Sequence, residues 1–113
     1  MYQLSDSMSG QTKAEKQAIK LRYATGLFKA LQKSSFKSFR QMAESGDMEP
    51  SHIQKISVGK VNVTLTVNVA IANALGISYS ELADYYDGVT EKDTKEFLEY
   101  LAKQKSIRGN KKL

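Results

Sequence analysis

The stretch SFRQMAESGDMEPSHIQKISVGK, residues 38–60, decides the fold that the sequence predicts. It has the pattern of two short helices joined by a tight turn. Gly46 and Asp47 mark the turn, because both residue types tolerate a left-handed backbone. Pro50 marks the first turn of the second helix, where its missing N–H costs nothing, and that helix is expected to run to about Val58.

The polar and apolar residues of this stretch separate onto different faces. Ile53 and Ile56 provide the second helix with an inward face. Ala43 of the first helix is small enough to let the two helices cross closely. The side chains left pointing to solvent on the second helix are Ser51, His52, Gln54 and Lys55.

The ends of both short helices carry recognisable signals. Ser38 is a favourable N-cap, because its hydroxyl can accept a hydrogen bond from an otherwise unpaired backbone N–H. Gln41, three residues later, can complete a capping box with it. Gly59 ends the second helix at a position where a positive φ is easily adopted.

A longer helix is predicted before this stretch, over residues 13–34. Its apolar residues recur at three- and four-residue steps. They are Ala18, Leu21, Ala24, Phe28 and Leu31. Gly26 weakens the helix interior by roughly 1 kcal/mol relative to alanine, so a bend or a later start is expected there. Residues 1–12 are polar and without a period, and we predict a poorly ordered arm.

The segment VNVTLTVNVAI, residues 61–71, is ambiguous. Its alternation of apolar and polar residues and its β-branched content are typical of a strand. A helix from Thr64, closed by Gly76, accounts for the same residues and places one apolar stripe on one side. That stripe consists of Leu65, Val69, Ala72 and Leu75. No second strand is available to pair with the segment, so we predict the helix.

Two further helices are predicted toward the C-terminus. Ser78 and Glu81 form a capping box that opens a short helix. A longer amphipathic helix follows within residues 88–107. Its apolar side is formed by Phe97, Leu98, Tyr100 and Leu101. The basic tail, residues 108–113, is expected not to fold. The predicted fold class is therefore all-α.

Composition excludes several classes of function. The 113 residues suffice for one modest domain, and no apolar run approaches the ~20 residues of a membrane helix. The absence of cysteine excludes disulfides, thiol catalysis and cysteine-ligated zinc. With one histidine, His52, neither a histidine-rich metal site nor a catalytic triad is expected. We therefore expect a cytoplasmic protein that is not an enzyme and has no catalytic residue, metal or cofactor.

The charge pattern favours a polyanionic partner. The net charge is +5, which is compatible with nucleic acid. The charged residues within 1–37 are mostly basic, and those within 103–113 are all basic. Residues 81–99 are rich in acidic side chains. Each of these runs could equally be a solvated helix face.

Residues 28–85 carry a further set of spaced residues. They are Met42-Ala43, Pro50-Ser51, Ile53, Ile56, Gly59-Lys60, Asn62, Leu75-Gly76-Ile77 and Glu81-Leu82. In spacing and type this set resembles the phage-repressor-like (Xre, lambda-repressor-like) helix-turn-helix DNA-binding family. The resemblance implies five short helices around one core, residues 13–87, to which residues 88–107 add a C-terminal helix for packing or dimerisation.

Two positions depart from the family pattern. Asp47 stands at the turn position where the family usually has glycine, with Gly46 displaced to the preceding position. Ser57 stands where a glutamate is common. Neither departure breaks the expected geometry, but both leave the shape of the turn open.

The resemblance implies which residues read DNA, because the family's second motif helix lies in the major groove. The implied base-contacting residues are Ser51, His52, Gln54 and Lys55. Gln54 can pair bidentately with adenine, and Lys55 can donate to guanine. Glu49, at the mouth of the groove, can accept from a cytosine amine or cap its own helix, of which capping is favoured.

Phosphate contacts are implied at the edges of the motif. Ser38 and Arg40 lie at the start of the first motif helix. Lys60 and Asn62 flank the loop after the second. Such contacts fix the register on DNA without reading its sequence.

The function that these expectations favour is a sequence-specific regulator of transcription that binds double-stranded DNA, as a homodimer. Two alternatives stay open. One is an antitoxin-type autorepressor that also binds a toxin. The other is a protein-interaction module on the same scaffold, which would contact a protein such as the transcription machinery. Its contact surface would be the acidic set Asp84, Asp87, Glu91, Asp93, Glu96 and Glu99.

Overall fold

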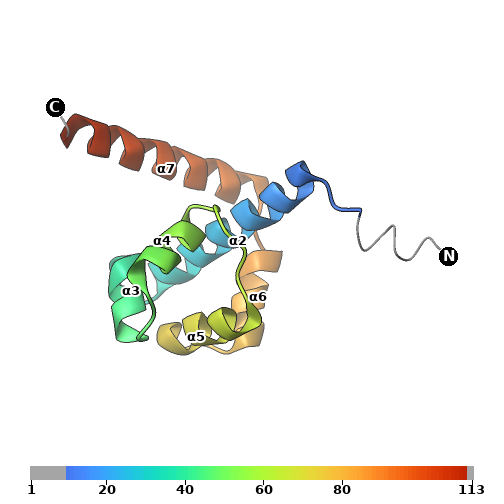
Figure 1. Cartoon of the computed structure of the whole chain (residues 1–113), viewed down its shortest axis with the longest axis vertical. Helices are drawn as coiled ribbons and strands as arrows, with labels where there is room; N and C mark the ends of the chain where they lie inside the picture. Colours follow the sequence, from blue (N-terminus) through green and yellow to red (C-terminus); the bar gives the residue numbers. More distant parts are fainter. Residues whose placement is uncertain (1–9, 112–113) are drawn as a thin grey trace.

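Six helices and no strand make up the part of the chain that the computed structural model describes, residues 10–111, with side chains described to Ile107. Figure 1 shows their arrangement: α2 (Lys13–Lys33), α3 (Phe39–Ser45), α4 (Pro50–Ser57), α5 (Leu65–Leu75), α6 (Tyr79–Asp87) and α7 (Glu91–Lys111). The predicted all-α class is confirmed. Residues 1–9 of the expected arm lie outside the described residues.

Helix α2 lies along the centre of the molecule and is continuous from Lys13, so the late start expected from Gly26 is wrong. It begins with a capping box that was not predicted from the sequence, in which Thr12 and Glu15 exchange backbone-to-side-chain hydrogen bonds. Gly26 is buried where α2 crosses α6. A Cβ atom at this position would lie 2.8 Å from the backbone oxygen of Tyr85. The glycine therefore permits close packing of two helices.

The core is formed by one apolar face from each of the first five helices. Its fully buried side chains include Leu27 of α2, Met42 of α3, Ile53 and Ile56 of α4, and Ile71 of α5. Ala43 of α3 is also fully buried, which agrees with the predicted close helix crossing. Leu82 of α6 completes this core.

Helix α5 confirms that residues 61–71 do not form a strand. Thr64 is its N-cap, and Gly76 ends it with φ 73°. The predicted apolar stripe is wrong in part, because Leu65 is 62% exposed and Val69 41% exposed. Its other two members, Ala72 and Leu75, do face the core, and Ile71 and Val67 lie inward beside them. The helix is thus rotated relative to the predicted orientation.

Hydrogen bonds from α2 hold the elements on either side of it. The Tyr23 hydroxyl donates to Asn68 of α5 over 2.8 Å, and burial raises the pKa of this hydroxyl, with a further contribution from Tyr79. Arg22 donates to the backbone oxygens of Tyr86 and Asp87, at 2.8 and 2.7 Å. Its guanidinium also lies over the Tyr86 ring. These bonds fix the C-terminal end of α6 and hence the point where α7 begins.

Helix α7 packs on α2 through its first half only. Phe97 is buried and, with Tyr100, contacts the ring of Phe28 at centroid distances of 5.4 and 4.5 Å. Asp93 forms an ion pair with Lys29 at 2.8 Å. The second half extends beyond the other helices (Figure 1). It continues to Lys111, so the prediction that residues 108–113 do not fold is wrong for residues 108–111. None of the helices described could cross a membrane.

Candidate nucleic-acid interface

The connection between α3 and α4 is a Schellman turn with aspartate in the left-handed position. The N–H of Met48 donates to the oxygen of Ala43 over 2.8 Å, and that of Asp47 donates to Glu44 over 3.3 Å. Asp47 has φ 56°, whereas Gly46 has an ordinary φ of −91°. Gly46 serves close packing, since a Cβ there would lie 2.9 Å from the Cβ of Ala74. The departure at Asp47 thus leaves the turn intact.

The start of α4 is fixed by Glu49 and Pro50. Pro50 occupies the first turn, as predicted. The Glu49 carboxylate accepts from the backbone N–H of Ser51 at 3.4 Å and from its hydroxyl at 3.1 Å. Of the two roles considered for Glu49, the structure therefore gives it the capping role.

The end of α4 is fixed by Gly59, with φ 78°. The N–H of Lys60 donates back to the oxygen of Lys55 over 3.0 Å. Gln17 of α2 donates to the oxygen of Gly59, also over 3.0 Å. The loop after α4 is therefore attached to the central helix, and α4 is held at both ends.

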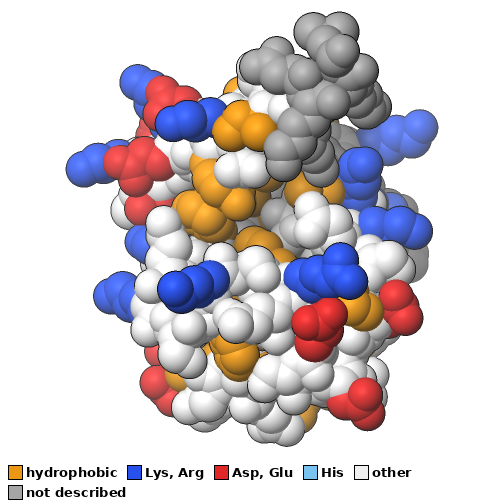
Figure 2. Space-filling view, turned by 90° about the vertical axis from the view of Figure 1, so that its left-hand side faces the viewer, with side chains coloured by type: hydrophobic (Ala, Val, Ile, Leu, Met, Phe, Trp, Pro, Cys, Tyr) orange, Lys and Arg blue, Asp and Glu red, His pale blue; other side chains and the backbone are white. Residues whose placement is uncertain are grey.

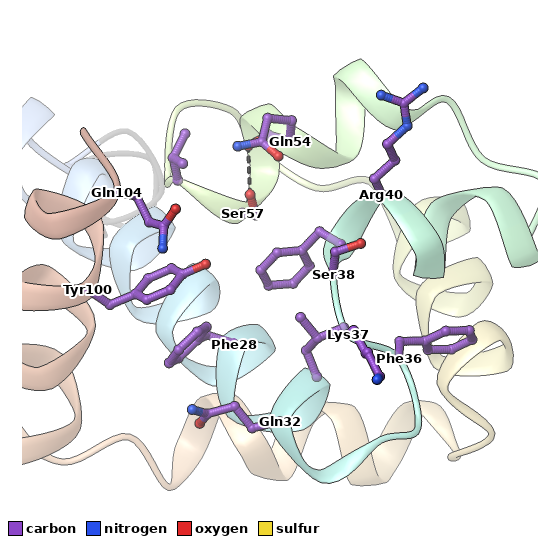
Figure 3. A pocket seen from close by; sticks show the side chains of 13 residues that line it. Phe28, Gln32, Phe36, Lys37, Ser38, Arg40, Gln54, Ser57, Tyr100 and Gln104 are labelled. Atoms are coloured by element: carbon purple, nitrogen blue, oxygen red, sulfur yellow. Dashed lines mark hydrogen bonds between the residues drawn. The ribbon is translucent and has the colours of Figure 1, made fainter. Parts of the chain in front are cut away.

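Helix α4 has one buried and one exposed face. Ile53 and Ile56 are each 1% exposed. The four residues predicted to contact bases, Ser51, His52, Gln54 and Lys55, are all exposed. Ser57 is buried, and its hydroxyl donates to the backbone oxygen of Gln54 over 2.8 Å (Figure 3). A serine at this position therefore satisfies its own polar atom within the helix.

The predicted phosphate-contacting residues lie in two places. Ser38 and Arg40 stand at the start of α3, and Lys60 and Asn62 lie in the loop after α4; all four are exposed. The Ser38 hydroxyl accepts from Gln41 over 3.0 Å as predicted. The capping box is incomplete, because the Gln41 side chain accepts from the N–H of Lys37 instead of that of Ser38.

Arg40 already has a partner within α3. Its guanidinium forms an ion pair with Glu44 at 3.2 Å, and the side chains are 78% and 56% exposed. An exposed pair of this kind contributes little to stability. Arg40 can therefore exchange this partner for another anion at small cost.

A groove of about 490 Å³ runs beside these residues, between the motif helices and α7. Figure 3 shows Tyr100 and Gln104 of α7 on one side of it, and Ser38, Arg40 and Gln54 on the other. Phe28 and Gln32 of α2 form part of its floor. No acidic side chain is among the residues that line it. Figure 2 shows hydrophobic side chains exposed on this side of the molecule, with both basic and acidic side chains around them.

The contribution of α7 to this groove was not predicted from the sequence. The sequence pattern places Tyr100 on an apolar helix side and predicts no role for Gln104. The signal that could have identified Gln104 is its spacing, since it follows Phe97 and Tyr100 at positions that share one helix face. Lys60 and Asn62 do not line the groove.

Within the described residues, no group of His, Asp or Glu side chains could hold a metal ion. A comparison with protein-family models, curated proteins and solved structures finds none that matches the chain. The physical arrangement of α3, α4 and α7 is therefore the basis for assigning a function.

Proposed function

We propose that this chain is a sequence-specific, double-stranded DNA-binding regulator of transcription with a lambda-repressor-like fold over residues 13–87. One observation supports this above the others. A short helix, α4, is held at both ends, buries Ile53 and Ile56, and exposes four hydrogen-bonding side chains on its other face. A rigid helix of this kind fits the major groove of B-DNA, which is about 12 Å wide.

The exposed side chains of α4 have the chemistry for reading base edges. Gln54 can pair bidentately with adenine, and Lys55 can donate to the O6 and N7 atoms of guanine. The Ser51 hydroxyl donates to Glu49, so its free capacity is as an acceptor for a base amine. His52 is the fourth candidate. Each good contact would discriminate between bases by ~1–3 kcal/mol.

Cations on both sides of α4 support the same proposal. Arg40 precedes α4 in the motif and Lys60 follows it, and both are exposed. Lys37 adds a third cation beside the groove. Together with Ser38 and Asn62, they can contact the phosphates that flank a bound major groove, which fixes the register and makes binding strongly salt-dependent.

Selection of bound duplexes from a random DNA pool tests this proposal. We expect an enriched sequence, whose symmetry and half-site spacing would reveal whether the chain binds as a dimer. The Gln54→Ala and Lys55→Ala variants should each lose ~1–3 kcal/mol of preference for that sequence. Lys92→Ala, an exposed lysine at the start of α7, is the control and should keep the preference. Absence of any enriched sequence, or full preference in both variants, would refute the assignment of α4.

A protein-interaction module is the second candidate, because the acidic side chains of α6 and α7 are exposed apart from Asp93. Asp93 forms an ion pair with Lys29 and is therefore not free to contact a protein partner, so the acidic surface is smaller than the sequence predicts. Salt distinguishes the two candidates. A protein that makes 6–10 phosphate contacts loses about 10³–10⁵ in affinity between 50 and 200 mM salt. Affinity for a protein ligand, such as a toxin, that persists over this range in the absence of DNA binding would favour the second candidate.

A further inference from the structure

The two halves of α7 differ in charge. The first half contains Glu91, Asp93, Glu96 and Glu99 beside two lysines. No acidic residue follows Glu99, whereas Lys103 and Lys105 do, and the sequence continues with further basic residues to its end. The boundary between the halves therefore lies near Tyr100.

The same boundary separates the packed half from the unpacked half. Asp93 and Phe97 attach the first half to α2 through an ion pair and buried ring contacts. In the second half, Lys103, Lys105 and Ile107 are all exposed, and the helix extends away from the other elements (Figure 1). The half of α7 that extends away from the other helices is thus the basic one.

The groove places the start of this basic half beside α4. Tyr100 and Gln104 face Arg40 and Gln54 across the groove (Figure 3). The residues lining the groove include two cations, Lys37 and Arg40, and no carboxylate. A polyanion that contacts Gln54 can therefore follow the lining of the groove to the start of the second half of α7 without a carboxylate among the lining residues.

We infer that the second half of α7 is a second DNA-contacting element, which binds phosphates next to the site that α4 reads. This inference rests on the proposed function. From Tyr100 to Lys111 the helix is roughly 18 Å long at 1.5 Å per residue, and DNA rises about 3.4 Å per base pair. The basic half of α7 can therefore follow about 5 base pairs of flanking duplex.

The exposed lysines favour DNA over a second copy of this chain as the occupant of this surface. Two copies that pack with their second halves side by side would bring Lys103 and Lys105 close to the same cations of the partner. Like charges in proximity are unfavourable. DNA phosphates supply the opposite charge, and the lysines that contact them remain partly hydrated.

The test uses the full chain and two duplexes, one with the selected site alone and one with about 5 additional flanking base pairs on each side. The Lys103→Ala/Lys105→Ala variant is compared with wild type. Lys92→Ala/Lys95→Ala is the control, because it removes the same charge from the first half of α7. All four lysines are exposed, so each variant should fold, which its helical circular dichroism would verify.

For wild type we expect a steeper salt dependence on the longer duplex than on the shorter one. The Lys103→Ala/Lys105→Ala variant should reduce the slope of log K against log salt by about 0.9 to 1.8 on the longer duplex, corresponding to one or two phosphates at 0.9 each. On the shorter duplex it should behave as wild type. Its sequence preference should be unchanged, and the control should match wild type on both duplexes.

Failure of this inference is distinguishable from failure of the proposed function. If wild type binds the selected site and the variant has the slope of the control on the longer duplex, the inference about α7 is wrong and the role of α4 stands. The inference is equally wrong if the variant changes only the oligomeric state in sedimentation. If wild type selects no DNA sequence, the proposed function and the inference fail together.

Discussion

At the end of α3, Asp47 adopts the left-handed backbone conformation and Gly46 allows close packing against α5. A single glycine often performs both roles at the end of a helix. Asp47 takes the left-handed backbone, φ 56°, where a Cβ is unfavourable by ~1–2 kcal/mol for most residues. No hydrogen bond of its side chain offsets this cost within the described part of the chain. Its carboxylate also stands at the negative end of the α3 dipole. We expect Asp47→Gly to raise the free energy of unfolding by about 1 kcal/mol, measured by urea denaturation.

Gly46→Ala is the control, and it should lower the free energy of unfolding. Its new Cβ would lie 2.9 Å from the Cβ of Ala74, and overpacking of this kind costs about 1–3 kcal/mol. If Asp47→Gly lowered stability, or if Gly46→Ala had no effect, the division of tasks between the two residues would be incorrect.

The sequence was sufficient to place a turn at Gly46-Asp47 but not to assign the two roles. Both residue types tolerate a positive φ, so local preference favours the glycine as the left-handed residue. The contact that decides the matter comes from Ala74, which is 28 positions away in the chain and belongs to α5. Local pattern therefore predicts the turn, and tertiary packing determines its shape.

At the scale of the element, α5 shows the same limit. Its existence and its two ends follow from Thr64, Gly76 and the lack of a partner strand. The orientation of α5 does not follow from the sequence, because nearly every residue of LTVNVAIANAL is small or apolar. Several faces of the helix are therefore equally hydrophobic. The Tyr23–Asn68 hydrogen bond and the burial of Ile71 identify the inward face.

Two substitutions in α5 test this orientation. Ile71→Ala should lower the free energy of unfolding by about 2–5 kcal/mol, because it leaves a cavity in the core. Leu65→Ala should change it by less than ~0.5 kcal/mol, since this side chain is mostly exposed. Both are measured by urea denaturation at equilibrium. Equal losses at the two positions would instead support the stripe predicted from the sequence.

Gly26 tests the crossing of α2 and α6. Alanine in a helix interior is favoured over glycine by roughly 1 kcal/mol, so helix propensity alone predicts that Gly26→Ala stabilises. The new Cβ would lie 2.8 Å from the oxygen of Tyr85 and 2.9 Å from its carbonyl carbon. These are backbone atoms, which cannot move without displacing α6. We therefore expect a net loss of about 1 kcal/mol or more in the free energy of unfolding.

Ala18→Gly supplies the calibration for this comparison. Ala18 is an exposed residue of the same helix, so this change reports propensity within α2, and a loss of roughly 1 kcal/mol is expected. A stabilised Gly26→Ala variant would show that α2 and α6 are not packed so closely.

For the whole molecule, the candidate interface could be predicted in part. The exposed face of α4 followed from two isoleucines and a proline within one short helix, which is local information. The groove could not be predicted from local information, because its shape depends on where α7 is attached. That attachment combines Lys29 with Asp93 and Phe28 with Phe97, pairs separated by more than 60 positions. Nothing local to either partner indicates such a contact.

The ion pair that attaches α7 makes its stability depend on pH. The hydrogen bond from Lys29, with that from the Thr90 N–H, lowers the pKa of Asp93 from 3.8 to about 2. Because the pKa is lower in the folded state than in the unfolded state, the carboxylate stabilises the fold above about pH 4. This contribution is lost progressively as the pH falls from about 4 to about 2.

We therefore expect Asp93→Asn to be less stable than wild type at pH 7 and to show a flatter decline in melting temperature between pH 4 and pH 2. Lys29→Gln should have a similar effect, because it removes the largest cause of the lowered pKa. Glu99→Gln, an exposed carboxylate on the same helix, is the control and should follow wild type. Thermal denaturation by circular dichroism across this range measures all four proteins. A decline in Asp93→Asn as steep as that of wild type would mean that another carboxylate causes the acid sensitivity and that Asp93 does not attach α7.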